Sequence, residues 1–276
     1  MKIYKKGITH GGKFHADDVF ATALLKKLYP DFTVTRVISV PDSIPDDTVV
    51  YDIGRGRFDH HQNDTSEREN GIRYAAFGLL WKEYGALACG SENIQQKLDS
   101  CFVQKIDDSD NNGTHDSVSM VISSYNPSWD SDESGDNAFD KAVSMAADIL
   151  HNLINYELGS ERAKEEVSLA YNKMHNKTVI LERFAPFKSV LAETDAVFVI
   201  YPSNRGGYNI QCIPVSAENN ESKLPFPESW CGKEGEDLQS ESGYKSIRFV
   251  HKSGFIASAN EFEEAVKIAA DLVQSM

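Results

Sequence analysis

Residues 51–62, YDIGRGRFDHHQ, lead from the end of a predicted strand to the triplet DHH at 59–61. The predicted strand covers 48–53, and Asp52 lies near its end. The triplet alone is common, but ligand-type side chains also stand at the ends of other predicted elements. These side chains are His10, His15, Asp17, Asp107 and Asp110. Because divalent Mn, Mg, Fe and Zn use this mixture of imidazoles and carboxylates, the sequence predicts one metal site.

The composition is that of a folded globular protein. The chain has 276 residues, 41% of them hydrophobic and 25% charged, which suits one large domain or two ordinary ones. A net charge of −14 disfavours a protein that coats long duplex nucleic acid, which would present a basic stripe. It does not exclude an anionic substrate, because bound metal ions supply local positive charge.

Several kinds of site and location are disfavoured by the sequence. The four cysteines are scattered without a CxxC pair, so neither a structural zinc site nor a disulfide framework is expected. The N-terminal stretch MKIYKKGITHGGKFHADD lacks the apolar core of about 7–15 residues that a signal peptide needs. No run approaches the roughly 18 apolar residues of a membrane span. We therefore expect a soluble, cytoplasmic protein with no membrane partner.

The first sixty residues alternate between strand and helix patterns. Strand patterns cover 2–9, 32–40 and 48–53, and a helix pattern covers 17–29. This order predicts an α/β layer in which helices pack on a sheet. Sites in such sheets gather at the carboxyl ends of strands, where His10 and Asp52 are expected.

The rest of the chain changes in character near residue 184. Before it, helix patterns cover 73–84, 91–107, 118–125, 137–157 and 160–175. Strand patterns cover 178–182, 196–201, 208–215, 246–251 and 254–258, a polar loop is expected over 216–243, and a last helix begins at Asn260. We place a domain boundary near 184, with a metal-binding catalytic domain over 1–184 and a smaller α+β substrate-binding domain over 185–276.

The predicted ligands suit metal-assisted phosphoryl hydrolysis. That chemistry uses two cations roughly 3.5–4 Å apart, with one carboxylate able to bridge them. Asp52 is the natural bridge because it ends a strand between the other groups in sequence. In an extended segment His60 and His61 point to opposite sides, so we assign His60 to the metal and His61 to the substrate phosphate or leaving group. The full set of candidate ligands is His10, His15, Asp17, Asp52, His60, Asp107 and Asp110.

Each candidate alone has an ordinary structural explanation. Asp17 at a helix start is typical of a cap or first-turn residue that faces the helix dipole. Asp107 and Asp110 fit a solvated acidic turn equally well. Together, the ligand-type side chains at successive strand and helix ends favour a functional site.

Five stretches, taken in order, resemble the DHH phosphoesterase superfamily and, more closely, the MYG1 (UPF0160) family. They are THGGKFHADDVFATALL at 9–25, YDIGRGRFDHHQ at 51–62, FVQKIDDSDNNG at 102–113, FPESWCG at 226–232 and FVHKSGFIASA at 249–259. The DHH triplet alone is weak evidence, whereas the ordered set covers nearly the whole chain and is specific.

The resemblance implies a DHH-type catalytic domain with a parallel sheet and helices on both faces. It also implies a second domain that closes over the substrate and a dinuclear centre of two Mn²⁺ ions, with Mg²⁺ as the alternative. Members of the superfamily split pyrophosphate, polyphosphate, small cyclic dinucleotides or short oligonucleotides. MYG1-type proteins are described as 3′–5′ RNA exonucleases. By this analogy His61 contacts the phosphate, one metal is held by His10, His15 and Asp52, and the other by Asp17, Asp52, His60 and Asp107.

The chain departs from the superfamily at three places. His15 stands where most members have Asp, which shifts the first metal site toward Fe, Co or Zn. The aspartate motif after the helix is altered, which leaves the choice between Asp107 and Asp110 open. Cys231 stands where the family usually has an arginine, and Lys223 stands near the position of another usual arginine. An arginine can bind a phosphate through two parallel hydrogen bonds, so its replacement is not conservative.

Cationic residues of the second domain are candidates for substrate binding. They are Lys223, Arg248 and His251, with Arg205 and Lys252 nearby. The alternative is a hairpin with ordinary exposed cations.

Three functions follow in order of preference. The first is a hydrolase of phosphodiesters, most simply a 3′–5′ exonuclease on short RNA or small nucleotides, in which His61 and Asp52 are catalytic. The second is a pyrophosphatase or polyphosphatase, which would need more cations around a very small substrate. The third is a non-catalytic, metal-stabilised regulatory binding protein. The sequence leaves open whether the chain forms a homo-oligomer.

Overall fold

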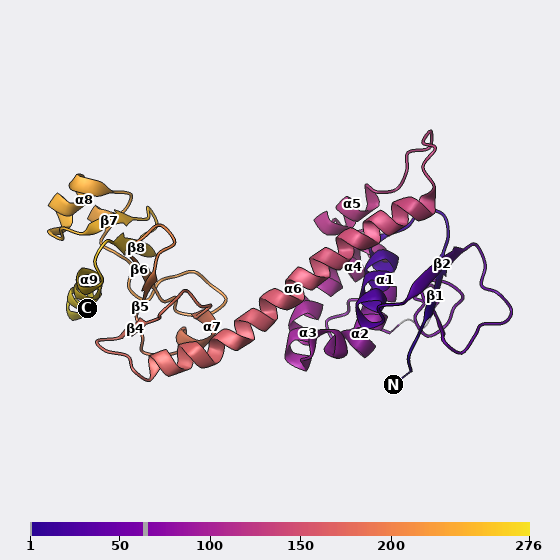
Figure 1. Cartoon of the computed structure of the whole chain (residues 1–276), viewed down its shortest axis with the longest axis horizontal. Coiled ribbons are helices and arrows are strands. Elements are labelled where there is room, and N and C mark those ends of the chain that lie inside the picture. Colours follow the sequence, from indigo (N-terminus) through magenta and orange to yellow (C-terminus); the bar gives the residue numbers. More distant parts are fainter. Residues whose placement is uncertain (1, 63–65) are drawn as a thin grey trace. The chain divides into compact units, whose positions relative to one another are not determined.

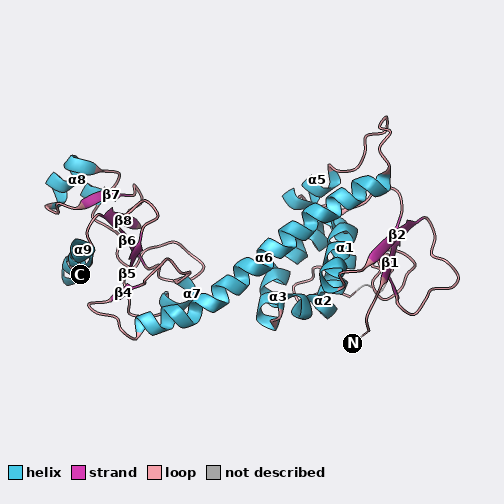
Figure 2. Ribbon diagram, viewed as in Figure 1, coloured by secondary structure: helices cyan, strands magenta, loops and turns pink. Residues whose placement is uncertain are grey.

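The computed structural model describes residues 2–62 and 66–276 and divides into two compact units, Met1–Leu158 and Gly159–Met276. The division falls inside helix α6 (Gly135–Tyr171), whereas the boundary inferred from the sequence lies near residue 184. Helices and strands occur in both units (Figure 2). No helix within the described ranges is long and apolar enough to cross a membrane.

The first unit is built on a parallel sheet with strand order β2-β1-β3. Its strands are β1 (Lys6–His10), β2 (Thr33–Val37) and β3 (Thr48–Val50), and β1 and β2 are labelled in Figure 1. His10 pairs with Val37, and Ile8 pairs with Val50, so the carboxyl ends of all three strands meet at one edge. The parallel sheet and its helices confirm the predicted α/β class. That helices cover both faces stays a prediction.

Helix α1 (Ala16–Leu28) carries the first turn of acidic residues to that edge. Asp18 Oδ1 accepts a hydrogen bond from the His15 N–H at 2.9 Å, which satisfies one of the free donors at the helix start. The helix is almost wholly buried and packs against α2 (Ala76–Cys89), where the rings of Phe20 and Phe77 lie 5.5 Å apart. Its apolar surface is therefore core.

The predicted helix over 91–107 is longer and is interrupted. Helix α3 (Glu92–Leu98) passes through a π-helical turn, Asp99–Val103, into α4 (Gln104–Asn112). Gly113 ends α4 in the left-handed region with φ 66°, as glycine commonly does after a helix. Helix α5 (Ser117–Ser123) follows.

Helix α6 is continuous where the sequence predicts two helices, over 137–157 and 160–175. Ser160, which follows Gly159, is a residue type that often caps a helix start, which favoured a second helix beginning there. A single glycine inside a helix costs only about 1 kcal/mol, which tertiary packing on both sides outweighs. Leu150 and Ile154 pack before the glycine, and Val167 after it.

The second unit contains a mixed sheet with strand order β4-β5-β6-β8-β7. The strands are β4 (Thr178–Ile180), β5 (Phe198–Pro202), β6 (Tyr208–Cys212), β7 (Ile247–Val250) and β8 (Ile256–Ala259). In this sheet only β4 and β5 pair in parallel, and the pairs β5–β6 and β7–β8 are antiparallel hairpins.

Short helices complete the second unit. They are α7 (Lys188–Leu191), α8 (Gly235–Ser242) and α9 (Phe262–Gln274). Helix α8 lies in the stretch 216–243 that was expected to be loop, and buries Leu238 beneath the sheet's apolar residues. Helix α9 adds Ala265 and Ile268 to the same core.

Candidate metal centre

Ligand-type side chains from four segments meet at the carboxyl edge of the parallel sheet. Each segment places them there because it ends or begins at that edge, as His10 does at the end of β1. The residues form three groups, which are His10, Asp18 and Asp52; His15, Asp17 and Asp110; and Asp52, Asp59, His60 and His61. Within each group the ligand atoms lie within 4.8 Å of one another. Asp52 belongs to two groups.

The first group surrounds the end of β1. His10 Nε2 lies 3.1 Å from Asp52 Oδ2 and 3.4 Å from Asp18 Oδ2. The hydrogen bond with Asp52 raises the pKa of His10 to about 9. Burial raises the pKa of Asp18 to about 8, although the charge of His10 opposes this. Asp18 was not among the predicted ligands, which included only its neighbour Asp17 from this helical turn.

His60, which belongs to the third group, also contacts residues of the second. The Nε2 atom of this ring lies 2.9 Å from Asp110 Oδ2, and its Nδ1 lies 3.3 Å from Asp52 Oδ1 and 3.9 Å from Asp17 Oδ2. His15 Nδ1 lies 3.6 Å from Asp110 Oδ1. Complete burial raises the pKa of Asp17 well above its ordinary value, and the neighbouring carboxylates raise it further.

Buried polar atoms at this edge lack hydrogen-bond partners among the described residues. They are Asp17 Oδ1, Asp18 Oδ2, Asp52 Oδ1 and His60 Nδ1. Buried polar groups are normally satisfied, since leaving one without a partner costs about 1–3 kcal/mol. A divalent cation would satisfy these oxygen and nitrogen atoms together and offset the repulsion among the carboxylates. The residues present therefore fit divalent metal ions.

Within the DHH triplet, Asp59 accepts hydrogen bonds that orient the His61 ring. Asp59 Oδ1 accepts hydrogen bonds from the His61 N–H at 3.0 Å and from its ring Nδ1 at 2.8 Å, and Oδ2 accepts from the Arg55 N–H at 2.5 Å. Burial raises the pKa of Asp59, but these hydrogen bonds outweigh it, so the pKa is below its ordinary value. Because the Asp59 carboxylate already accepts three hydrogen bonds, it is better suited to orient His61 than to bind a metal ion.

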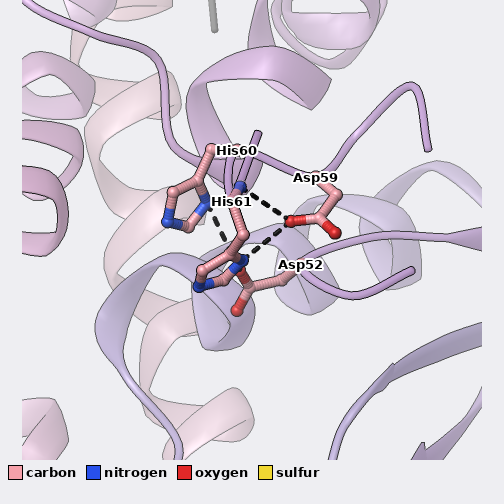
Figure 3. Close-up of side chains that lie close together, drawn as sticks. All are labelled: Asp52, Asp59, His60 and His61. Atoms are coloured by element: carbon pink, nitrogen blue, oxygen red, sulfur yellow. Dashed lines mark hydrogen bonds and ion pairs between the residues drawn. The ribbon is translucent and has the colours of Figure 1, made fainter. Parts of the chain in front are cut away.

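The expectation that His60 and His61 point to opposite sides is wrong. Their rings are stacked, with centroids 4.2 Å apart and an interplanar angle of 29° (Figure 3). No strand covers residues 59–61, and the Asp59 carboxylate accepts hydrogen bonds from both the backbone and the ring of His61. The two rings differ in exposure instead, since the His60 side chain is 7% exposed and the His61 side chain is 60% exposed.

The turn after β3 holds Asp52 in an unusual backbone conformation. Asp52 has φ 56°, Gly54 has φ 85° and Arg55 has φ 56°. Non-glycine residues seldom adopt this region, although aspartate tolerates it better than most. The Asp52 N–H donates to the Phe58 carbonyl at 2.9 Å, which closes the turn and fixes the carboxylate at the sheet edge.

Asp107 lies outside the three groups. Its Oδ2 accepts from Arg68 Nη2 at 2.7 Å and its Oδ1 accepts from the Gly78 N–H at 3.0 Å. Helix α2 has no side-chain cap of its own at Ala75, so Asp107 provides one from α4. Burial raises the pKa of Asp107 to about 7, and the Arg68 charge and hydrogen bond oppose this rise.

The cations predicted to bind substrate in the second unit have internal partners. Lys223 Nζ donates to the carbonyls of Leu191, Thr194 and Ala196 at 2.6–3.0 Å. Arg248 donates to the carbonyls of Arg205 and Gly206 at 3.2 and 2.7 Å, and His251 Nδ1 accepts from the Ser253 N–H at 3.1 Å. Arg248 and Arg205 also line a cavity of about 520 Å³. The Cys231 thiol faces the Pro227 carbonyl at 3.4 Å.

A second cavity, of about 460 Å³, opens beside the metal-ligand groups. His10, Asp52 and His61 line it, together with Lys13 and Arg55. Sequence reasoning did not select Lys13 and Arg55, because both stand in loops without a periodic pattern.

Comparison with known proteins extends over both units. The family described as "Uncharacterised protein family (UPF0160)" matches residues 6–273. The "MYG1 protein" of Dictyostelium discoideum is 27% identical over 310 residues, which cover 95% of this chain and 94% of that protein. The "MYG1 exonuclease" of Rattus norvegicus is 28% identical, covering 95% and 82%, and that of Homo sapiens is 26% identical, covering 95% and 84%. The chain therefore belongs to the MYG1 family (UPF0160).

Proposed function

We propose that this chain is a metal-dependent hydrolase of phosphodiester bonds that shortens RNA or small nucleotides from the 3′ end. The observation that carries the proposal is the set of buried, unpartnered ligand atoms around Asp52 at the carboxyl edge of the sheet. Relatives that cover 95% of the chain are named exonucleases, which supports a nucleic-acid substrate.

The three groups of ligands suit two divalent ions, Mn²⁺ or Mg²⁺, that share Asp52. His10, Asp18 and Asp52 would hold one ion. His60, Asp17, Asp110 and Asp52 would hold the other, with His15 beside Asp110. Such ions, when bound, neutralise charge on the phosphate and make water a better nucleophile.

The exposed ring of the triplet has a separate task. Asp59 holds His61 Nδ1, so Nε2 is the nitrogen that remains to donate a proton. In the proposed reaction the oxygen of water bonds to phosphorus and the bond between phosphorus and the leaving sugar oxygen breaks. That oxygen takes its proton from His61, and the proton lost by water passes to solvent.

The test uses protein stripped of metal and a short 5′-labelled RNA, with Mn²⁺ or Mg²⁺ added back. We expect products shortened from the 3′ end only when metal is present. Asp52→Asn should lower the rate by more than about 100-fold. Mutating a residue that only hydrogen-bonds a metal ligand typically costs about 10–100-fold in activity, and Asp52 would itself be a ligand of both ions. Asp148→Asn, the same change at an exposed position of α6, should leave the rate unchanged.

Three outcomes would overturn the proposal. Cleavage that survives Asp52→Asn would place the activity elsewhere. No cleavage with either metal, together with phosphate release from pyrophosphate or tripolyphosphate, would replace the exonuclease with a pyrophosphatase or polyphosphatase. Absence of all three activities in metal-loaded protein would favour a binding protein.

A further inference from the structure

Two cations, Lys13 and Arg55, line the cavity beside the metal-ligand groups, together with carboxylates that include Asp59. His61 and the ligands His10 and Asp52 also line it. Its volume of about 460 Å³ is in the range of small-molecule and nucleotide sites. The cavity therefore has room for more of a substrate than the phosphate that is cut.

The two loop cations are not used to stabilise the fold. Within 2–62 and 66–276, neither the Lys13 nor the Arg55 side chain has an ion pair or hydrogen-bond partner. The nearby Arg57 behaves differently, because it pairs with Glu83 and lies over the Phe58 ring at 5.2 Å. The turn thus directs one arginine to a protein partner and leaves the other at the cavity.

The backbone of Arg55 is fixed by the group that also orients His61. Asp59 Oδ2 accepts from the Arg55 N–H at 2.5 Å, and Asp59 Oδ1 holds the His61 ring at 2.8 Å. One carboxylate therefore sets the spacing between this cation and the ring that faces the cavity.

The backbone on either side of Lys13 is fixed as well. Arg36 Nη2 donates to the Gly12 carbonyl at 2.6 Å, and the Phe14 N–H donates to Asn126 Oδ1 at 3.1 Å. Lys13 therefore stands on an anchored loop while its side chain stays exposed at the cavity.

Charge explains why such cations matter here. The protein carries a net charge of −14, and the metal-ligand groups include several carboxylates. Two metal ions would offset the carboxylates and the phosphate that is cut, but any further phosphate of the substrate would meet an acidic surface. Unpaired cations beside the ligands would attract that second phosphate.

We propose that Lys13 and Arg55 bind the phosphate adjacent to the one that is cut, so that the site prefers substrates with two neighbouring phosphates. The inference rests on the proposed function and specifies its substrate class as an RNA chain or a 5′-phosphorylated dinucleotide, in preference to an isolated diester.

The experiment compares Lys13→Gln, Arg55→Gln and the double variant with Arg57→Gln as the matched control. We expect each single change to raise KM for a short RNA about tenfold, as loss of one charge-assisted contact does, while kcat stays within about twofold. Arg55→Lys, which keeps the charge, should recover part of the loss. Wild-type protein should cleave a 5′-phosphorylated dinucleotide more efficiently than the same dinucleotide without that phosphate, and the double variant should lose this preference.

A binding measurement separates this inference from the proposed function. Fluorescence anisotropy of the same RNA in chelator, repeated over a range of salt, should give a salt slope smaller by about 0.7 for each cation removed. If RNA is bound with this change in slope but never cleaved, the proposed function fails, and of the inference only the binding of phosphate by Lys13 and Arg55 remains. If RNA is cleaved while KM, substrate preference and slope match those of Arg57→Gln, the inference fails alone. If RNA is neither bound nor cleaved, both fail.

Discussion

Asp107 and Asp110 show how neighbouring carboxylates on one helix take different tasks. Both are on α4, but Asp110 faces His60 at 2.9 Å while Asp107 faces Arg68 at 2.7 Å and the start of α2. Asp107 is fully buried, so its charge depends on Arg68 and on the Gly78 N–H for compensation. Asp110 lies among the ligand-type side chains His15, Asp17 and His60.

Substitution of these aspartates should separate metal binding from stability. Asp110→Asn should weaken Mn²⁺ binding, measured by calorimetry on metal-stripped protein, by more than about tenfold. Asp107→Asn should leave the number of bound ions unchanged but lower the free energy of unfolding in urea by about 3 kcal/mol, because Arg68 would remain buried with one partner fewer. Asp108→Asn, at an exposed hydrogen bond to Asn112 on the same helix, is the control. If Asp107→Asn weakened Mn²⁺ binding and Asp110→Asn only lowered stability, Asp107 would be the metal ligand instead.

At this scale the sequence indicated several members of the cluster correctly as neighbours. His10 and Asp52 could be placed because strand ends meet at one edge of a parallel sheet. Asp18 was missed, because the sequence does not show that both carboxylates of this helical turn, Asp17 and Asp18, lie at the sheet edge. The choice between Asp107 and Asp110 could not be made from their spacing, since residues three apart share a helix face. The structure pairs Asp107 with Arg68, a contact that the sequence spacing does not indicate.

The helical elements contain the largest differences between expectation and structure. The π-helical turn Asp99–Val103 shifts the phase of α4 relative to α3, so a uniform period over 91–107 misplaces the faces of α4. Arg68 holds this turn through Asp99, at 2.7 and 2.9 Å. A contact between segments distant in sequence, such as Arg68 with Asp99, leaves no periodic pattern in the sequence. The strands and most helices could be predicted, because their hydrophobic residues recur at the period of the element.

One link between elements in the second unit predicts a pH dependence. Glu264 of α9 accepts hydrogen bonds from the backbone N–H groups of Lys245 and Ser246, just before β7. Burial raises the pKa of Glu264, but the hydrogen bonds from Ser246 and Lys245 outweigh it, so the pKa falls below its ordinary 4.5. A lowered carboxyl pKa contributes stability above the unfolded value, and this contribution is lost as pH falls through the folded value.

We therefore expect Glu264→Gln to lower the free energy of unfolding by about 1 kcal/mol at neutral pH. The difference from wild type should shrink as the pH falls below 4.5, because wild type loses its charge there. Urea unfolding at several pH values measures both effects. Glu263→Gln, an exposed change in the same helical turn, is the control. If the difference in unfolding free energy stayed constant with pH, the charge of the Glu264 carboxylate would not be its cause.

The whole molecule contains two units with separate cores. Phe20, Phe77 and Trp81 belong to the core of the first, and Phe198 and Ile210 to a core of the second. The predicted strands of both units were recognisable from β-branched alternation. The helix α8 within 216–243 was not, because its eight residues are mostly polar and bury only Leu238.

Metal should stabilise one unit selectively, because the described ligand groups all belong to the first. At about 100 times its Kd, Mn²⁺ should add about 2.7 kcal/mol to the stability of the state that binds it. Amide hydrogen exchange should therefore slow in the first unit and stay unchanged in the second. The effect should disappear in Asp52→Asn and persist in Asp148→Asn. Equal slowing in both units would contradict the assignment of the ligands.

The most direct test of the central claim is a Mn²⁺ anomalous difference map from crystals of metal-stripped protein soaked in the ion. We predict two peaks roughly 3.5–4 Å apart, with the Asp52 carboxylate between them. One peak should lie beside His10 and the other beside His60 and Asp110. A single peak with closed coordination, or no peak at the carboxyl edge of the parallel sheet, would contradict a two-metal centre.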